Sequence, residues 1–316
     1  MKIFDTHSDT PFDLFRDKLD LCNDVTHISL GKAEKYEKKF FVSAFWSQQN
    51  KSDAECWGVF TESSPYYDGL LEKYRDKAML CRNADDIKQC FNDGKFGTIK
   101  AIEDVRLIDG HLERIETLYN MGIRHILPVW GETSHIGGAW DSDEGLTDFG
   151  KEVVRECERL GIIVDVSHMS KKSFWDTAEI CKGPIVASHS NYQEICSHGR
   201  NLDKDQLSEI IRRGGLAGLN LCRSHIDLKY IGVYVTLEFD FLGDIEKHVF
   251  YCLENGGEKT LCLGCDWDGT KMSDHIHDVS EIDKLYERLV KDGVPEKTAD
   301  DIFFNNAYNF YINNLK

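Results

Sequence analysis

A histidine and an aspartate stand two residues apart near the start of the chain, at His7 and Asp9. They follow an apolar run over residues 2–6 that has the composition of a buried strand. Residues two apart on a strand point to the same side. The pair would therefore aim an imidazole and a carboxylate at one point, as a divalent metal ion requires. A strand cap followed by a turn before Pro11 would explain the same two residues without a metal.

The secondary-structure elements that must position this pair are predicted strands that alternate with predicted helices. Short apolar or β-branched runs predict eight strands, at 2–6, 40–46, 98–102, 125–130, 162–167, 185–188, 216–221 and 261–265. Helical periodicity predicts helices at 146–160, 171–181, 203–213, 240–254 and 282–291, with a closing helix over 301–315.

This alternation predicts an α/β fold, a single-domain (β/α)8 TIM-type barrel over residues 1–316. A doubly wound sheet is the alternative, but such sheets usually bind a nucleotide through a glycine-rich first turn, and no such turn is present. Residues 47–95 exceed a normal barrel connection, so they predict a helical insertion or a lid over the site.

The composition narrows the classes of function. A formal net charge of -17 argues against nucleic acid as a partner, because a phosphate backbone calls for a basic surface. No run of about 18 apolar residues predicts a membrane span, and we expect no signal peptide or lipid anchor. Eleven cysteines with irregular spacing are read as small core residues of a reduced protein. The expected location is therefore cytoplasmic.

More histidines and carboxylates stand where the later predicted strands end. Active-site residues of such barrels lie at the carboxyl ends of the strands, so these side chains should gather with His7 and Asp9 at one rim. The further candidates are Glu103, His168, His189, Asp266 and Asp268. A single terminal histidine often only caps a strand, but this many at one rim predict a metal site.

The number of ligands favours two metal ions. One catalytic zinc typically takes three protein ligands and a water, whereas this set suits two ions bridged by a lone glutamate, Glu103. Two dications would balance the charges of Asp9, Glu103, Asp266 and a bridging hydroxide. Such a pair lowers the pKa of the shared water and polarises a carbonyl, which is hydrolytic chemistry.

Several motifs together resemble the membrane (renal) dipeptidase family, a branch of the amidohydrolase-like metal-dependent barrels. The likeness extends from Asp5 to about Asn309. Its clearest segments are GLTDFGKEVVRE at 145–156, VDVSH at 164–168, SHS at 188–190, SHGRN at 197–201 and CDWDG at 265–269.

The resemblance implies a binuclear zinc dipeptidase with two Zn²⁺ ions per chain. His7 and Asp9 would bind the first zinc and Glu103 would bridge, while His168 and His189 would bind the second. Asp266, beside the first zinc, would carry the proton from the bridging water to the leaving amine.

Arg200 matches the arginine with which this family grips the C-terminal carboxylate of its substrate. A planar guanidinium suits that task, and it would let an acidic protein hold an anionic substrate. A surface ion pair is the alternative reading of Arg200.

Two positions depart from the family pattern. Trp130 stands where many relatives have a histidine that stabilises the oxyanion, and Cys222 stands where many have a tyrosine. Both are expected to contact substrate and to affect efficiency, because one oxyanion donor can be worth about 10² to 10³ in rate. His135 in the following loop could supply a donor, or could be a solvated loop residue.

Three hypotheses follow. The first is a dipeptidase, with L-Xaa-D-Xaa substrates as one possibility. The second is a related amidohydrolase acting on N-acyl amino acids or other small amides, and the third is a catalytically idle metal-binding homologue. The expected partners are a dipeptide and, by the resemblance, a second copy of the chain in a homodimer; no nucleic acid and no membrane are expected.

Overall fold

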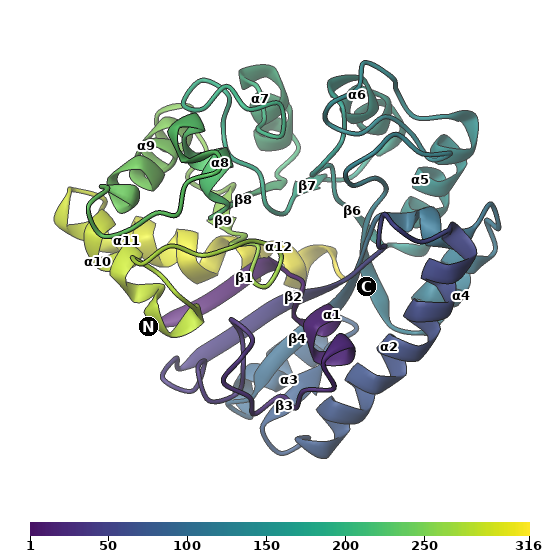
Figure 1. The fold of residues 1–316 in the computed structure, drawn as a ribbon, viewed down its shortest axis with the longest axis horizontal. Coiled ribbons are helices and arrows are strands. Elements are labelled where there is room, and N and C mark those ends of the chain that lie inside the picture. Colours follow the sequence, from purple (N-terminus) through teal and green to yellow (C-terminus); the bar gives the residue numbers. More distant parts are fainter.

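The computed structural model describes residues 1–316. Its strands are β1 (Lys2–Ser8), β2 (Lys38–Trp46), β3 (Ala78–Leu80), β4 (Phe96–Glu103), β5 (Ile123–Leu127), β6 (Ile163–Val164), β7 (Val186–Ala187), β8 (Leu216–Leu219) and β9 (Leu261–Leu263). Eight of them form one parallel sheet in the order β6-β5-β4-β2-β1-β9-β8-β7. Figure 1 shows helices arranged around these strands.

The sheet curls into a nearly closed barrel. Its two outer strands on this path, β6 and β7, are joined by a single parallel bridge between Asp165 and Val186. The backbone N–H of Val166 also donates to the carbonyl of Val186, at 2.7 Å. The predicted single-domain (β/α)8 barrel is therefore confirmed.

The helices follow the strands around the barrel. They are α1 (Thr10–Arg16), α2 (Asp53–Lys73), α3 (Ala84–Asn92), α4 (Arg114–Asn120), α5 (Asp148–Leu160), α6 (Lys171–Ile180), α7 (Lys204–Arg212), α8 (Arg223–Ile226), α9 (Phe241–Glu254), α10 (Asp283–Lys291), α11 (Glu296–Asp300) and α12 (Asn306–Asn314). None of them is both long enough and apolar enough to cross a membrane.

Local sequence signals set several helix ends. A capping box joins Ser52 and Glu55 at the start of α2, and Asp203 with Gln206 forms another at the start of α7. Helix α5 ends at Gly161, whose φ of 74° is left-handed and favours glycine. These signals turn each helix back toward the next strand and so keep the strand ends on one rim.

The segment 47–95 contains α2, β3 and α3. Helix α2 contacts β2 and β3, and the short strand β3 pairs with the first half of β4. Gln49 alone from this segment lines the cavity at the carboxyl ends of the strands. The insertion thus covers the outer surface of the barrel, and no helix of it lines that cavity.

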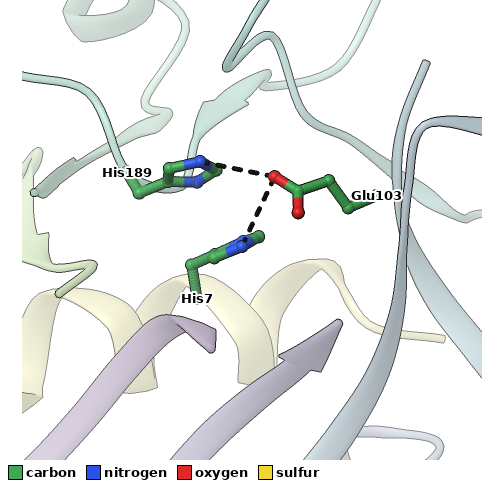
Figure 2. Close-up of side chains that lie close together, drawn as sticks. All are labelled: His7, Glu103 and His189. Carbon is green, nitrogen blue, oxygen red and sulfur yellow. Dashed lines mark ion pairs between the residues drawn. The ribbon is translucent and has the colours of Figure 1, made fainter. Parts of the chain in front are cut away.

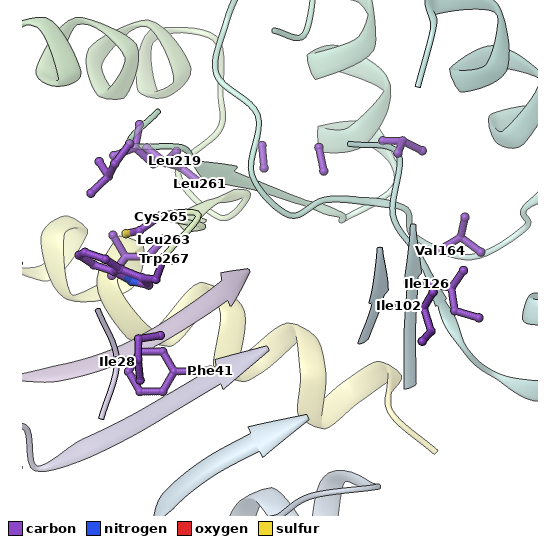
Figure 3. Close-up of a cluster of buried hydrophobic side chains, with 14 of the residues drawn as sticks. Ile28, Phe41, Ile102, Ile126, Val164, Leu219, Leu261, Leu263, Cys265 and Trp267 are labelled. Atoms are coloured by element: carbon purple, nitrogen blue, oxygen red, sulfur yellow. The ribbon is translucent and has the colours of Figure 1, made fainter. Parts of the chain in front are cut away.

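Apolar packing holds the barrel and its helices together. The larger core cluster has 66 buried residues, including Ile102, Ile126 and Val164 from the neighbouring strands β4, β5 and β6, which lie close together in Figure 3. A second cluster joins the strands to the C-terminal helix, where Tyr311 stacks on Phe4 with ring centroids 5.1 Å apart. Helix α12 therefore supports the barrel at the first residues of β1.

Candidate metal centre and substrate cavity

The predicted ligands lie at the carboxyl ends of five strands. His7 lies within β1 and Asp9 directly follows it, while Glu103 ends β4. Three further candidates come from the loops after β6, β7 and β9, namely His168, His189 and Asp266. The structure brings all six together, and the buried ones include His7, Glu103 and His189.

Three imidazoles converge on one oxygen of the glutamate. The Glu103 Oε1 atom lies 3.2 Å from His168 Nε2, 3.6 Å from His7 Nε2 and 3.6 Å from His189 Nε2. Figure 2 shows the imidazoles of His7 and His189 lying next to each other, both facing the carboxylate of Glu103. The Nε2 atoms of His168 and His189 lie only 2.8 Å apart, so the two nitrogens point at a common position.

The donor atoms form two overlapping groups suited to a metal ion. One group is His7, Glu103 and His189, and the other is His7, Asp9 and Asp266, each with ligand atoms within 4.8 Å of one another. His7 Nε2 and Asp9 Oδ1 are buried and have no hydrogen-bond partner. Buried polar atoms are rarely left unpaired, so these residues fit a bound cation.

Two carboxylates of this cluster have raised pKa values because too little positive charge lies near them. Burial, with the charge of Asp9 added, raises the pKa of Glu103 to about 8. Burial likewise raises the pKa of Asp266 to about 6. Crowded carboxylates in a low-dielectric site repel one another, and a dication relieves that repulsion.

The imidazoles of His168 and His189 are in the protonation state that binds a metal ion. Burial, with cationic neighbours added, lowers the pKa of His168 and of His189 well below the usual value. Both rings are therefore neutral at pH 7, which is the state in which an imidazole binds a metal.

The backbone is strained at this rim. His168, Asp266 and Asp268 have φ values of 68°, 63° and 64°, in the left-handed region that few non-glycine residues adopt. Such conformations persist where the surrounding structure enforces them, and they cluster at functional sites. Here they turn the chain at the strand end so that the side chains of His168 and Asp266 face the cluster.

Sequence reasoning missed Ser188, which orients two of the imidazoles. Its Oγ lies 2.7 Å from His189 Nδ1 and 3.4 Å from His7 Nδ1. A contact at Nδ1 leaves Nε2 of each ring for the metal and fixes the ring plane. Serine has no motif of its own, so only its place directly before His189, in SHS at 188–190, could have suggested this role.

A cavity of about 430 Å³ opens over the cluster. Its walls include the metal-cluster residues Asp9, Glu103, His168 and Asp266, the three predicted substrate contacts Arg200, Trp130 and Cys222, and further residues that include Phe12, Asp13, Arg16, Trp46, Gln49, Trp140, His225 and Asp268. All three predicted substrate contacts thus border the space above the metal cluster. Such a volume is typical of a small-molecule site.

Arg200 is buried, with only 4% of its surface exposed. Its Nη1 donates to Ser190 Oγ at 2.7 Å and its Nη2 donates to the carbonyl of His189 at 3.1 Å. A guanidinium has five N–H groups, so three remain for other partners. The surface ion pair considered for Arg200 is excluded, since no carboxylate pairs with it and it lies in the cavity wall.

A cluster of aromatic side chains lines part of the cavity. Trp46 packs against Phe12 and Trp130 with ring centroids 5.4 and 4.9 Å away, and Trp130 lies 5.8 Å from the ring of His168. Phe12 and Trp46 were not among the predicted contacts. His135 does not line the cavity; its Nδ1 lies 3.2 Å from Asp53, so it is a loop residue and supplies no donor there.

A parallel barrel whose strand ends gather imidazoles and carboxylates below a small cavity defines a metal-dependent hydrolase. The family model for membrane dipeptidases, peptidase family M19, matches residues 1–310. The chain is also 31% identical over 246 residues to an uncharacterized protein in the pqqA 5′ region of Klebsiella pneumoniae, which covers 75% of this chain and 89% of that protein. The chain therefore belongs to the membrane dipeptidase family and is a dipeptidase-type metallohydrolase.

Solved structures share the fold over the whole chain. The metallopeptidase dipeptidase AC superposes with a TM-score of 0.93 at 23% identity, covering 100% of this chain and 99% of its own. A metallopeptidase of Rhodobacter sphaeroides, solved with a phosphinate mimic of the dipeptide L-Ala-D-Ala, gives a TM-score of 0.92 at 22% identity with the same coverage.

Proposed function

We propose that this chain hydrolyses the amide bond of dipeptides with two zinc ions held at the barrel rim. The observation that carries the proposal is the convergence of His7, His168 and His189 on Glu103 below a cavity bordered by a buried arginine. That arrangement supplies a metal cluster and an anion contact within one small space. A dipeptide carries both an amide bond and a carboxylate.

The proposed metal ligands form two sets, one on each side of a shared Glu103. His7 and Asp9 would hold the first ion, His168 and His189 the second, and Glu103 would lie between them. When bound, such a pair of ions lowers the pKa of water and polarises the amide carbonyl, which hydrolysis at neutral pH requires. Ser188 keeps the rings of His7 and His189 in the ligating orientation.

Arg200 would bind the C-terminal carboxylate of the substrate. Two of its five N–H groups are used by Ser190 and His189, which fix the guanidinium in place. The remaining groups on Nη1 and Nη2 can donate to one carboxylate. Because the arginine is buried, this contact is charge-assisted and poorly screened by solvent.

Asp266 would move a proton from the attacking water to the leaving amine. Its carboxylate lines the cavity and accepts one hydrogen bond, 3.3 Å long, from Asn220 Nδ2 to Oδ2. Its pKa, raised by burial to about 6, is close to the working pH and suits a group that both accepts and releases a proton.

Steady-state hydrolysis of paired substrates tests the proposal. The panel pairs L-Ala-L-Ala and L-Ala-D-Ala with N-acetyl-L-Ala and N-acetyl-D-Ala, which lack the N-terminal amine. We expect the zinc-loaded protein to cleave a dipeptide with the higher kcat/KM. Turnover of the acyl compounds alone would contradict the proposal in favour of an N-acyl amidohydrolase, and a metal-loaded protein that cleaves none of them would indicate an idle homologue. A preference for L-Xaa-D-Xaa, a homodimer and a cytoplasmic location stay predictions.

A further inference from the structure

Two aspartates that are not candidate ligands make the same local contact at the ends of two different strands. The carboxylate of Asp5, in β1, accepts the backbone N–H of His7 at 3.1 Å. The carboxylate of Asp165, which directly follows β6, accepts the backbone N–H of Ser167 at 2.9 Å. Each aspartate thus bonds the residue two positions further along the chain, a contact that competes with the strand ladder. Both aspartates are buried, with at most 1% of the residue exposed.

Each aspartate also bonds the neighbouring strand. Asp5 Oδ2 accepts the backbone N–H of Cys265 at 3.2 Å and the indole N–H of Trp267 at 2.9 Å, both just after β9. Asp165 Oδ1 accepts the backbone N–H of Ser188, just after β7, at 3.0 Å. The ladder is short at both junctions, because β1 pairs with β9 at one position and one bridge beyond it, and β6 meets β7 at a single bridge. The two carboxylates therefore hold strand ends together where few backbone contacts do.

The two junctions carry the ligands of different ions. The junction of β1 with β9 carries His7 and Asp9, the proposed ligands of the first ion, with Asp266 beside them. The junction of β6 with β7 carries His168 and His189, the proposed ligands of the second ion. The backbone that presents the ligands of each ion is therefore held by the carboxylate at its own junction.

We propose that Asp5 and Asp165 are positioning residues, Asp5 for the first metal ion and Asp165 for the second. The inference rests on the proposed function, which divides the ligands between two ions. A functional site needs its side chains held within about 0.5 Å of the productive geometry. Groups that orient metal ligands without touching the metal are typically worth about 10- to 100-fold in metal affinity.

A chain of hydrogen bonds fixes Asp165 in turn. Its Oδ2 lies 3.0 Å from His125 Nε2 in β5, and His125 Nδ1 lies 3.0 Å from the hydroxyl of Tyr311 in α12. Burial raises the pKa of Asp165, but the hydrogen bonds from His125 and from the two N–H groups outweigh burial and hold the pKa below its ordinary value. The carboxylate is therefore ionised and only accepts, so His125 donates from Nε2. The chain connects the C-terminal helix to the junction that carries the second ion's ligands.

Zinc affinity in variants with one impaired site separates the two roles. His168→Asn removes a ligand of the second ion, and asparagine tolerates the left-handed backbone of His168. Asp9→Ala removes a ligand of the first ion. In the His168→Asn background, Asp5→Asn should weaken zinc binding by about 10- to 100-fold and Asp165→Asn by less than about threefold. In the Asp9→Ala background the order should reverse, because each amide offers one accepting atom where the carboxylate offers two.

The affinities are measured by competition with a chromophoric chelator, and urea unfolding establishes that each variant is folded. A purely structural role would weaken both sites alike or neither of them. Equal losses in the two backgrounds would therefore overturn the inference, and so would unchanged affinity in both.

Tyr311→Phe tests the role of Asp165 in a variant that keeps both carboxylates. The ring can still stack on Phe4, as Tyr311 does at 5.1 Å, and only the hydroxyl is lost. We expect the affinity for the second ion to fall by about two- to tenfold, the size of one lost hydrogen bond, and the affinity for the first ion to stay unchanged. Tyr67→Phe is the matched control: Tyr67 is also buried, but its hydroxyl lies 3.1 Å from Ser43 Oγ, outside both junctions. Unchanged affinities in Tyr311→Phe would overturn the role of this chain.

The zinc stoichiometry of the wild type separates the two levels of the argument. If the wild type binds a single zinc ion, the proposed function is wrong in its division of the ligands, and the inference fails with it. If the wild type binds two ions and the two asparagine variants weaken both alike, only the positioning inference is wrong.

Discussion

Replacing Asp266 by asparagine should abolish most turnover while leaving the fold and the metal ions in place. The change keeps the shape of the side chain, and asparagine tolerates the left-handed backbone that Asp266 adopts at φ 63°. The only hydrogen bond to the carboxylate is the long contact from Asn220, so little stability depends on its charge. What the variant loses is the ability to accept and release a proton.

The magnitude follows from that loss. Proton transfer by a positioned group contributes about 10² to 10⁴ in rate, which corresponds to roughly 3 to 5 kcal/mol in the activation barrier. The pKa of Asp266, raised by burial to about 6, places it near the optimum for such transfer at neutral pH. We therefore expect kcat to fall by two to four orders of magnitude and KM to change little.

The assay combines steady-state kinetics on L-Ala-D-Ala or L-Ala-L-Ala with metal analysis of the same sample. Asp268→Asn is the matched control: Asp268 also lines the cavity and has φ 64°, but its oxygens are already held by Thr10 Oγ1 and the His27 N–H, each at 2.6 Å. The kcat of Asp268→Asn should fall by less than about tenfold. Wild-type kcat in Asp266→Asn would refute the proton-transfer role, and loss of metal in parallel with activity would show that Asp266 acts as a ligand instead.

Three further predictions concern the surroundings of the site. Ser188→Ala should weaken metal binding by about 10- to 100-fold in chelator competition, because both imidazoles lose their orienting contact; unchanged affinity would contradict that role. Arg200→Lys should raise KM for dipeptides far more than it lowers kcat, since an ammonium cannot hold a carboxylate at two points, and an unchanged KM would exclude the carboxylate contact. His248 is buried, which lowers its pKa to about 4 in the folded protein. As the pH falls from about 6.5 to 4, this histidine is protonated in the unfolded chain but not in the folded protein, which favours unfolding. Between pH 7.5 and 4.5 the wild type should therefore lose roughly 2 to 3 kcal/mol more unfolding free energy than His248→Gln, measured by urea unfolding, and equal losses would contradict the assignment.

The barrel was predictable because its signals are local. Eight apolar runs gave eight strands of the closed path, and capping residues marked the helix ends. The strands β6 and β7 are shorter than predicted. Asp165 Oδ1 accepts the N–H groups of Ser167 and Ser188 at 2.9 and 3.0 Å, so a side chain replaces the strand ladder there. Periodicity carries no information about such a contact.

The remaining errors have similar causes. Strand β3 (Ala78–Leu80) has three residues and pairs only with β4, so its sequence is too short to show a period. The predicted closing helix begins as a π-helical turn, η4 (Asp301–Asn305), before α12. In the site, the candidate ligands could be found from their positions at strand ends. Contacts made only by tertiary packing, such as those of Ser188 and Trp46, could not.

Metal stoichiometry tests the central claim most directly. The protein is stripped with a chelator and titrated with zinc, and bound metal and dipeptide hydrolysis are followed together. We predict two equivalents of zinc per chain, with hydrolysis restored as the second equivalent binds. Glu103→Gln, which removes the charge between the two groups of ligands, should lower the affinity for both. Saturation at a single equivalent, or hydrolysis that persists in the stripped protein, would contradict the account.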